Sequence, residues 1–383
     1  MMWEIAKLGD ISKNIQTGPF GSQLHQSDYS ECGIPVVMPK DLVGGKISEE
    51  SIARVDKTHV ERLCRHKIEV GDILYSRRGD VGRCAHVTKK EEGWLCGTGC
   101  LRVTIDSEKA DSRFVFFQLQ HPDTIGWVEK HAVGATMLNL NTTILSSVPI
   151  RLPALEIQKR IADILSAYDD LIENNQRQIK LLEEAAQRLY KEWFVDLRFP
   201  GHENTKIVDG VPEGWSRTNI NGILTFHRGY DLTKNEMKAG RYPVIGSTSI
   251  IGYHNEFKIK GPGIVTGRSG SLGKYQLVWD DFWPHNTSLY ISNYKGHNIF
   301  FVYSLLQTVD FASLNNGGAI PTLNRNVLSN IEVIEPEKKL RDVFAKIAEP
   351  QYQKIRNLEK QNDRLKTARD LLLPKFMSGE VEV

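Results

Sequence analysis

The sequence GATMLNLNTTILSSVPIRLPALEIQKRIADILSAYDDLIENNQRQIKLLEEAAQRLYKEWF, residues 134–194, recurs in diverged form 183 positions later without a gap. The matching positions are Gly134 and Gly317, Leu140-Asn141 and Leu323-Asn324, Leu145-Ser146 and Leu328-Ser329, Pro153 and Pro336, and Ile172 and Ile355. Self-similarity at a fixed offset is the signature of repeated structural units. The chain is therefore predicted to contain two diverged copies of one unit.

The repeat continues upstream with a drift of a few residues. The matching positions there are Gly71-Asp72-Ile73-Leu74 and Gly261-Pro262-Gly263-Ile264-Val265, Gly79-x-x-Gly82-Arg83 and Gly270-x-x-Gly273-Lys274, and Trp3 and Trp215. Short apolar runs between Gly, Pro, Asn and Asp predict strands at 34–38, 72–76, 101–105, 263–266 and 288–292. Helices are predicted at 113–120 and 298–307, each with a Phe-Phe pair assigned to the core (Phe116-Phe117 and Phe300-Phe301). Each copy is therefore expected to begin with a mixed α/β domain.

A long amphipathic helix is predicted to follow each domain. From Pro153 to about Pro200-Gly201, apolar residues recur in steps of four and three, broken once at Asn175. The first seam contains Ile161, Leu165, Ile172, Ile179, Leu182 and Leu189. The second contains Ile355, Leu358, Leu365 and Leu372, and is expected to end near Pro374. Each helix of some 40 residues would be roughly 60 Å long.

The order of the segments also predicts the direction of the helices. The second domain begins where the first helix ends, and the second helix begins where that domain ends. If the termini of that domain lie close together, the second helix runs back along the first. The predicted fold is mixed α/β, with two domains separated by a long antiparallel coiled-coil helix pair and related by a pseudo-twofold axis. The expected bounds are 1–152 for the first domain, 153–199 for the central helix, 200–335 for the second domain with a linker at 200–212, and 336–383 for the C-terminal helix.

Composition and charge exclude several classes of protein. The 383 residues include 49 Lys plus Arg and 47 Asp plus Glu, so the net charge of +2 excludes a polycation but not a local basic face. No apolar run approaches a membrane span, and MMWEIAKLGD lacks the layout of a secretory signal, which predicts a cytoplasmic protein. The five cysteines do not form a disulfide framework. Cys96 and Cys100 have a CxxxC spacing, but reduced thiols explain them better than a metal site does.

The sequence contains no catalytic motif that we recognise. The stretch from Gly267 to Lys274 has five residues between its glycines instead of four, and Tyr275 follows the lysine, so it fails as a P-loop. No GxGxxG, GxSxG, HExxH or EF-hand pattern occurs, and the acidic pair Asp169-Asp170 falls on the solvated side of a helix. We therefore expect a binding or scaffolding protein with no catalytic residues and no bound cofactor.

Polar, glycine-rich loops are the best candidates for function. Residues 17–24, TGPFGSQL, would present Thr17, Phe20, Ser22 and Gln23 on a turn. A second loop carries Arg77, Arg78 and Arg83, and its counterpart in the second copy carries Arg268, Ser269 and Lys274. Arginine and lysine on an open turn suit phosphate contacts, and arginine can also bind a guanine edge. The alternative is a set of structural hairpins with solvated charges.

These features together closely resemble the specificity subunit of type I restriction-modification systems, over nearly the whole chain. In the first copy the resemblance rests on TGPFGSQL followed by Gly33-Ile-Pro-Val-Val, on Gly71-Asp-Ile-Leu with Gly79-x-x-Gly82, and on Leu152-Pro153 with Gln158 and Ile161. In the second it rests on Gly214-Trp215, Tyr242-Pro-Val-Ile245, Gly263-Ile-Val with Gly270-x-x-Gly273, and Trp283-Pro-His-Asn-Thr-Ser-Leu289, which adds Asn286 to the candidates. The helix ending Leu189-Tyr-Lys-Glu-Trp-Phe194 is also typical of that family.

The resemblance implies a non-catalytic, DNA-reading subunit of an adenine methyltransferase and ATP-dependent restriction endonuclease. Its partners would be double-stranded DNA, two methyltransferase subunits and two motor-nuclease subunits. S-adenosylmethionine, ATP and Mg²⁺ would belong to those partners. Each domain would bind one half of a bipartite, asymmetric site, while the paired helices set the spacer and dock the methyltransferases.

Two other functions compete with this one. A stand-alone methyltransferase or nuclease would need a cofactor loop or a carboxylate cluster, and we find neither in the sequence. A coiled-coil adaptor that joins two proteins without touching DNA is compatible with the near-neutral charge. A steep salt dependence of DNA binding would distinguish the specificity subunit from the adaptor.

Overall fold

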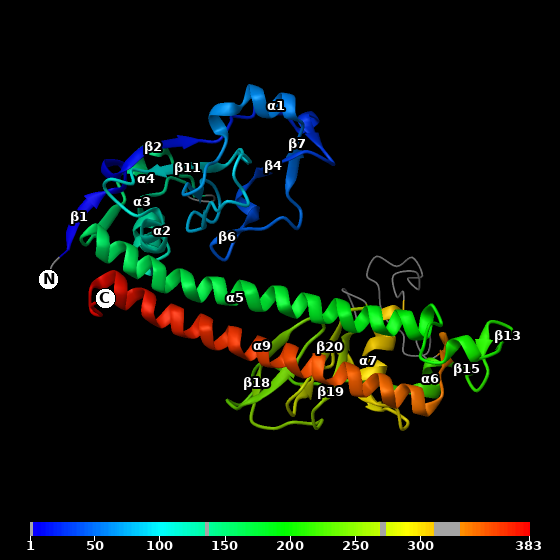
Figure 1. Ribbon diagram of the computed structural model, residues 1–383. Coiled ribbons are helices and arrows are strands. Elements are labelled where there is room, and N and C mark those ends of the chain that lie inside the picture. The colour runs from blue at the N-terminus through cyan, green and yellow to red at the C-terminus, as the bar shows by residue number, and fades with distance from the viewer. Residues whose placement is uncertain (1–2, 135–137, 269–272, 310–329) are drawn as a thin grey trace. The chain divides into compact units, whose positions relative to one another are not determined.

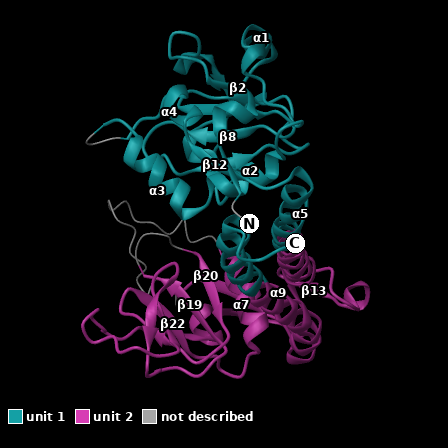
Figure 2. Ribbon diagram, turned by 90° about the vertical axis from the view of Figure 1, so that its left-hand side faces the viewer, with its two compact units in different colours: residues 1–173, 362–383 teal, residues 174–361 magenta. Residues whose placement is uncertain are grey.

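The computed structural model describes residues 3–134, 138–268, 273–309 and 330–383 (Figure 1). Contacts divide the chain into two compact units: unit 1 is Met1–Glu173 with Asn362–Val383, and unit 2 is Asn174–Gln361 (Figure 2). The long helices α5 (Leu155–Tyr190) and α9 (Lys338–Ser378) each give one segment to each unit. This division cuts both helices, so it does not test the domain bounds, which remain a prediction. The repeat positions from Gly317 to Ser329 lie outside the described residues.

Unit 1 is a mixed α/β structure, as the sequence predicts. Its elements before α5 are β1 (Glu4–Lys7), η1 (Leu8–Ile11), β2 (Ser12–Thr17), η2 (Gln26–Asp28), β3 (Tyr29–Ser30), β4 (Ile34–Val37), η3 (Pro39–Asp41), β5 (Leu42–Val43), β6 (Lys46–Ile47), β7 (Ala53–Val55), α1 (Lys57–Arg62), η4 (Cys64–His66), β8 (Ile73–Ser76), β9 (Cys84–His86), β10 (Leu95–Cys96), β11 (Cys100–Ile105), α2 (Ser112–Leu119), α3 (Pro122–His131), α4 (Thr142–Ser146) and β12 (Pro149–Leu152). Two four-stranded sheets have the orders β2-β11-β8-β9 and β10-β4-β7-β3, and β1 pairs with β12.

Unit 2 repeats the main sheet of unit 1. Its elements after α5 are η5 (Lys191–Val195), η6 (His202–Asn204), β13 (Ile207–Val208), β14 (Val211–Pro212), β15 (Ser216–Asn219), α6 (Ile220–Ile223), β16 (Thr225–Arg228), β17 (Tyr242–Ile245), β18 (Ile250–His254), β19 (Gly263–Gly267), β20 (Tyr275–Val278), β21 (Trp283–Pro284), β22 (Ser288–Asn293), α7 (Ile299–Thr308) and β23 (Glu332–Glu335). The order β16-β22-β19-β20 matches β2-β11-β8-β9, and the pair β15-β23 matches β1-β12. The sequence repeat therefore corresponds to a repeated topology.

The short helices α2 and α7 cover these sheets, and their positions follow from their sequences. Asp111 caps α2 by accepting hydrogen bonds from the backbone N–H groups of Arg113 and Phe114, and Asn298 caps α7. Both Phe-Phe pairs are buried, as predicted: Phe116-Phe117 in unit 1 and Phe300-Phe301 in unit 2.

In unit 1, the start of α5 packs against the end of α9. Ile161 and Leu165 share a buried core with Phe376 and Met377, and the guanidinium of Arg369 pairs with the carboxylate of Asp169. The prediction that the second helix ends near Pro374 is wrong, because α9 continues to Ser378. A proline inside a helix costs roughly 3 kcal/mol, and burying Phe376 and Met377 in this core offsets that cost.

In unit 2, the end of α5 packs against the start of α9. Ala186 and Tyr190 share a core with Phe344 and Tyr352. Asn175, which interrupts the predicted seam, is buried, and its side-chain amide donates to the Gln361 side chain over 3.3 Å. The ten predicted seam residues are all buried or half-buried: Ile161, Leu165, Ile172, Ile179, Leu182, Leu189, Ile355, Leu358, Leu365 and Leu372.

The sequence predicts reduced cysteines without a metal site, and no membrane span. All five cysteines are free thiols, and burial raises the pKa of Cys84 and of Cys96 to about 12. Within the described residues, no cluster of three or more His, Cys, Asp or Glu side chains suits a metal ion. In the same parts of the chain, no helix has the length and apolar character that crossing a membrane requires.

Candidate nucleic-acid interface

Three loops of unit 1 meet where β2 and β8 end and β11 begins. The backbone N–H of Gly18, just after β2, donates to the Cys100 carbonyl over 2.9 Å. The N–H of Arg77, just after β8, donates to the Gly99 carbonyl over 2.7 Å. The two candidate loops of the first copy therefore lie on either side of residues 97–100.

The loop at residues 17–24 fits only because it contains glycine at position 18. A Cβ atom on Gly18 would lie 2.0 Å from the Gly97 carbonyl oxygen, well inside van der Waals contact. The hydroxyl of Thr98 donates to the Pro19 carbonyl over 2.9 Å and fastens the same loop. The loop is therefore packed closely against residues 97–98 and hydrogen-bonded to them.

The side chains of this loop divide into exposed and structural ones. Phe20 is 52% exposed, and the Arg77 guanidinium carbon lies 5.9 Å from the centre of its ring. Ser22 is exposed, while Thr17 is half-buried. The side-chain oxygen of Gln23 accepts from the N–H of Phe20 over 3.1 Å, so Gln23 closes the turn.

Residues 138–140 anchor the arginine loop, a role that the sequence does not predict. The Nε of Arg77 donates to the Leu140 carbonyl over 3.2 Å, and the N–H of Leu140 donates back to the Arg77 carbonyl over 2.8 Å. The N–H of Gly79 donates to the Leu138 carbonyl. The start of the repeated stretch thus fixes the position of Arg77.

The other two arginines of this loop are exposed. Arg78 forms a bridge to Asn139 through its backbone. Arg83 lies further along, where its Nε is 2.6 Å from the carboxylate of Asp80. The structure therefore brings Arg77 to the TGPFGSQL loop, places Arg78 beside Asn139 and pairs Arg83 with an acidic neighbour.

The buried side chain of His66 lies next to the first candidate loop. It is 2% exposed and lies beside the backbone of Thr17, and the neighbouring carbonyl of Arg65 accepts from the Gln16 side chain over 2.6 Å. Burial, assisted by the positive charges of Arg65 and Arg102, lowers the pKa of His66 from 6.5 to about 4. The folded chain therefore keeps this histidine neutral in a pH range where the unfolded chain protonates it.

The His66→Gln variant is expected to flatten the pH dependence of stability. The contribution of neutral His66 is complete above about pH 6.5 and is lost as the pH falls toward about 4, because only the unfolded state takes up the proton. The variant lacks the imidazole that takes up this proton. Its free energy of unfolding should therefore depend less steeply on pH than that of the wild-type chain, by up to about 1.4 kcal/mol per pH unit. Urea unfolding at several pH values measures this slope, with the exposed His25→Gln variant as control. An unchanged slope in His66→Gln would contradict the expectation.

Unit 2 forms the same arrangement from different residues. The N–H of Gly229, just after β16, donates to the Ser288 carbonyl, and the N–H of Arg268, just after β19, donates to the Thr287 carbonyl, both over 3.0 Å. A Cβ on Gly229 would lie 2.0 Å from the carbonyl oxygen of His285. Residues 228–232 are therefore the counterpart of TGPFGSQL.

The predicted site residues of unit 2 lie partly in this arrangement. Arg268 and Asn286 are half-buried on adjacent segments of it. Lys274 is exposed just before β20, and its carbonyl accepts from the Thr266 hydroxyl over 2.9 Å. Ser269 lies outside the described residues. Residues 228–232 are not recognisable from the sequence, because RGYDL shares only its glycine with TGPFGSQL.

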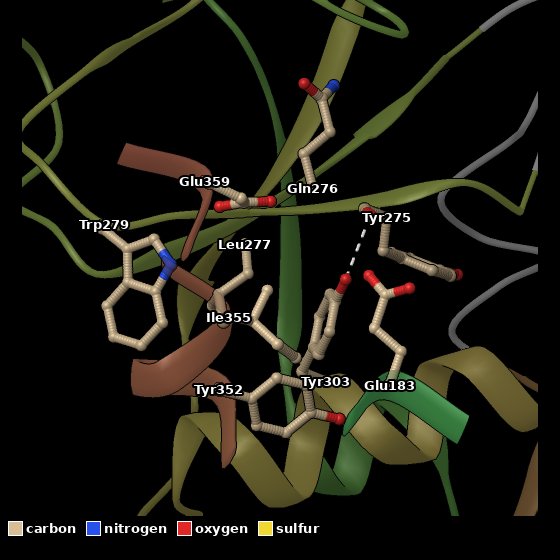
Figure 3. A pocket seen from close by; sticks show the side chains of 9 residues that line it. All are labelled: Glu183, Tyr275, Gln276, Leu277, Trp279, Tyr303, Tyr352, Ile355 and Glu359. Atoms are coloured by element: carbon tan, nitrogen blue, oxygen red, sulfur yellow. Dashed lines mark hydrogen bonds between the residues drawn. The ribbon is translucent and has the colours of Figure 1, made fainter. Parts of the chain in front are cut away.

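Unit 2 also contains a cavity of about 290 Å³, between β20, α7 and the two long helices (Figure 3). Its lining includes Trp279, Tyr303 and Tyr352, and Tyr303 donates to the Tyr275 carbonyl over 3.4 Å. The exposed carboxylates of Glu183 and Glu359 also line it. Because carboxylates repel phosphate, this cavity is a poor place for nucleic acid, unlike the arginine-bearing loops.

Comparisons with known proteins point to one family. The family model described as type I restriction modification DNA specificity domain matches residues 2–184 and again 212–367. The specificity subunit of the type I restriction enzyme MjaIX from Methanocaldococcus jannaschii is 26% identical, over 100% of this chain and 94% of its own length. The HindI specificity subunit from Haemophilus influenzae is 23% identical, over 99% of each chain.

A solved structure shares the fold. The crystal structure of the S subunit of a type I restriction-modification system from M. genitalium superposes with a TM-score of 0.66 at 18% identity, over 98% of this chain and 96% of that one. The matches to the family model cover most of the sequence and coincide with the two copies of the repeat. The chain belongs to the type I restriction-modification DNA specificity family.

Proposed function

We propose that this DNA specificity subunit binds each half of a bipartite DNA site with one set of three loops. The observation that carries the proposal is that both units hold these loops with the same backbone hydrogen bonds, at Gly18 and Arg77 in unit 1 and at Gly229 and Arg268 in unit 2. Loops held by strand ends can present side chains to base edges without a large ordering cost. The recognition domains are proposed to be residues 1–152 and 200–335.

The candidate contacts to DNA are the polar, basic and aromatic side chains of these loops. They are Thr17, Phe20, Ser22, Gln23, Arg77, Arg78, Arg83, Arg268, Ser269, Lys274 and Asn286. Arginine and lysine suit phosphate oxygens and guanine, and asparagine suits adenine. Because TGPFGSQL and RGYDL differ almost throughout, the two half-sites should differ and the full site should not be a palindrome.

The long helices are proposed to form one antiparallel coiled coil that sets the spacer between the half-sites. The packing of α5 on α9 inside each unit supports this role. The buried seam leaves the polar faces of the helices as the docking surface for two methyltransferase subunits, with two motor-nuclease subunits joining them for restriction. The chain itself is proposed to be non-catalytic, with S-adenosylmethionine, ATP and Mg²⁺ held by these partners.

Methylation mapping of a whole genome tests the function. A methylation-free host would express the neighbouring methyltransferase subunit with and without this chain. We expect a single split, asymmetric adenine motif to become methylated only when the chain is present. A complex that forms and binds S-adenosylmethionine without methylating any motif would favour the protein adaptor instead.

Lengthening the helices is expected to lengthen the spacer. Seven residues inserted between Glu173 and Asn174 and seven between Gln361 and Asn362 add about 10 Å of helix, or about three base pairs. The mapped motif should keep both half-sites and gain about that many unspecified positions. A changed half-site at constant spacing would contradict the proposed role of the helices.

A further inference from the structure

A hydrogen-bonded cluster in unit 2 joins the segment after β16 to the segment before β22. The carboxylate of Asp231 accepts a hydrogen bond from the side-chain amide of Asn286. The same oxygen, Oδ1, accepts one from Nη2 of Arg228 over 3.5 Å. Both charged side chains remain open to solvent, with 78% of Asp231 and 51% of Arg228 exposed.

The backbone holds this cluster firmly. The N–H of Tyr230 donates to the Pro284 carbonyl over 2.8 Å, and the N–H of His285 donates to the Ile245 carbonyl over 2.9 Å. Asp231 and Asn286 each follow one of these donors directly. The distance between their backbones is therefore fixed by the sheet, and DNA is not needed to bring them together.

The Asp231 carboxylate repels phosphate, so its presence on a DNA-binding surface is best explained by its contacts with neighbouring side chains. Asn286 can bind adenine by accepting from N6 and donating to N7, which uses its side-chain oxygen and one of its two N–H groups. The second N–H of that amide is the one that Asp231 can hold. When the Asp231 carboxylate accepts this N–H, the amide nitrogen of Asn286 must face Asp231. Asp231 therefore selects the amide orientation that fits adenine.

We propose that Asp231 is a positioning residue that orients Asn286 toward an adenine in the major groove of the second half-site, and that holds Arg228 beside it. This inference rests on the proposed function. Arg228 offers a fork of donors that suits a neighbouring guanine or phosphate. In this arrangement Asn286 recognises an adenine of the second half-site, and Arg228 contacts a neighbouring guanine or phosphate.

The corresponding positions of unit 1 use different chemistry. Gly18 and Gly229 occupy equivalent places, so Phe20 takes the position of Asp231, and Thr98 takes that of Asn286. In unit 1 the hydroxyl of Thr98 is bound to the Pro19 carbonyl, and Phe20 packs with Arg77. The first half-site therefore serves as an internal control for changes at Asp231.

Methylation mapping of the assembled complex with the Asp231→Ala and Asn286→Ala variants tests the proposal. Both variants should relax the same position of the second half-site, lowering discrimination for adenine there by about ten- to a hundredfold. The first half-site should keep its full specificity. Asp231→Asn should retain part of the discrimination, because its amide oxygen still accepts from Asn286.

The matched control is Asp209→Asn, which removes one carboxylate from the turn between β13 and β14, where a φ of 52° is tolerated by asparagine. Relaxation in Asp209→Asn as well would overturn the proposal. Full discrimination in Asp231→Ala would overturn it, as would a uniform loss of methylation with no relaxed position and no rescue in Asp231→Asn. Wild-type complex that methylates no split motif would overturn the proposed function instead.

Discussion

The Gly18→Ala variant should direct at least tenfold less methylation than the wild-type chain. The new Cβ atom would lie 2.0 Å from the Gly97 carbonyl oxygen, and both groups belong to backbone that hydrogen bonds hold in place. Overpacking of this kind typically costs 1–3 kcal/mol, and here the cheapest relief is to move the loop away from residues 97–100. That movement would separate Phe20 from Arg77 and disrupt the first candidate interface.

The Gly229→Ala variant should have the same effect through the other half-site, because its Cβ would lie 2.0 Å from the His285 carbonyl oxygen. Gly21→Ala is the matched control, since no atom lies within 4 Å of a Cβ at that position of the same loop as Gly18. Methylation rates of the purified complexes on one DNA site measure all three. Wild-type rates in both Gly18→Ala and Gly229→Ala would contradict the assignment of these loops.

The parts of the fold that follow from local sequence could be predicted. The strand predicted at 34–38 is found at Ile34–Val37, and that predicted at 288–292 is found at Ser288–Asn293, because apolar runs between turn residues identify buried strands. The Phe-Phe pairs lie in apolar segments of helical character, and both pairs are buried as predicted. The end of α9 was not predictable in this way, since it depends on burial of Phe376 against residues some 200 positions earlier in the chain.

The sequence predicts both loops of the candidate site in unit 1, but in unit 2 it predicts Arg268 and Asn286 without residues 228–232. In unit 1, TGPFGSQL is rich in turn residues and is recognisable by composition, and Arg77 follows a clear strand. In unit 2, the sequence around Gly229 carries no such signal, and its role follows from hydrogen bonds to Ser288 and from contact with His285. The signal that could have identified this loop is a glycine directly after the first strand of the main sheet in each copy, Gly18 in unit 1 and Gly229 in unit 2.

The Phe344→Ala variant is expected to lose about 3–5 kcal/mol of the free energy of unfolding of unit 2. Phe344 has none of its surface exposed. Its ring packs edge-on at centre-to-centre distances of 5.6 Å from Tyr190, 6.2 Å from Trp193, 5.3 Å from Phe194 and 6.4 Å from Phe301. These partners come from α5, η5 and α7, so the ring joins both long helices to α7, the helix that covers the main sheet of unit 2.

Hydrogen exchange of the full chain can measure this loss separately in each unit. In Phe344→Ala, peptides from α7 and β22 should exchange faster, while peptides from β8 and β11 of unit 1 should keep their protection. Val343→Ala, at a neighbouring position that is 39% exposed, should change stability by no more than about 0.5 kcal/mol. Equal effects of the two variants would show that the aromatic cluster does not hold α9 to unit 2. Loss of protection in both units at once would show that the two units unfold as one, so that damage to either recognition domain disables both half-sites.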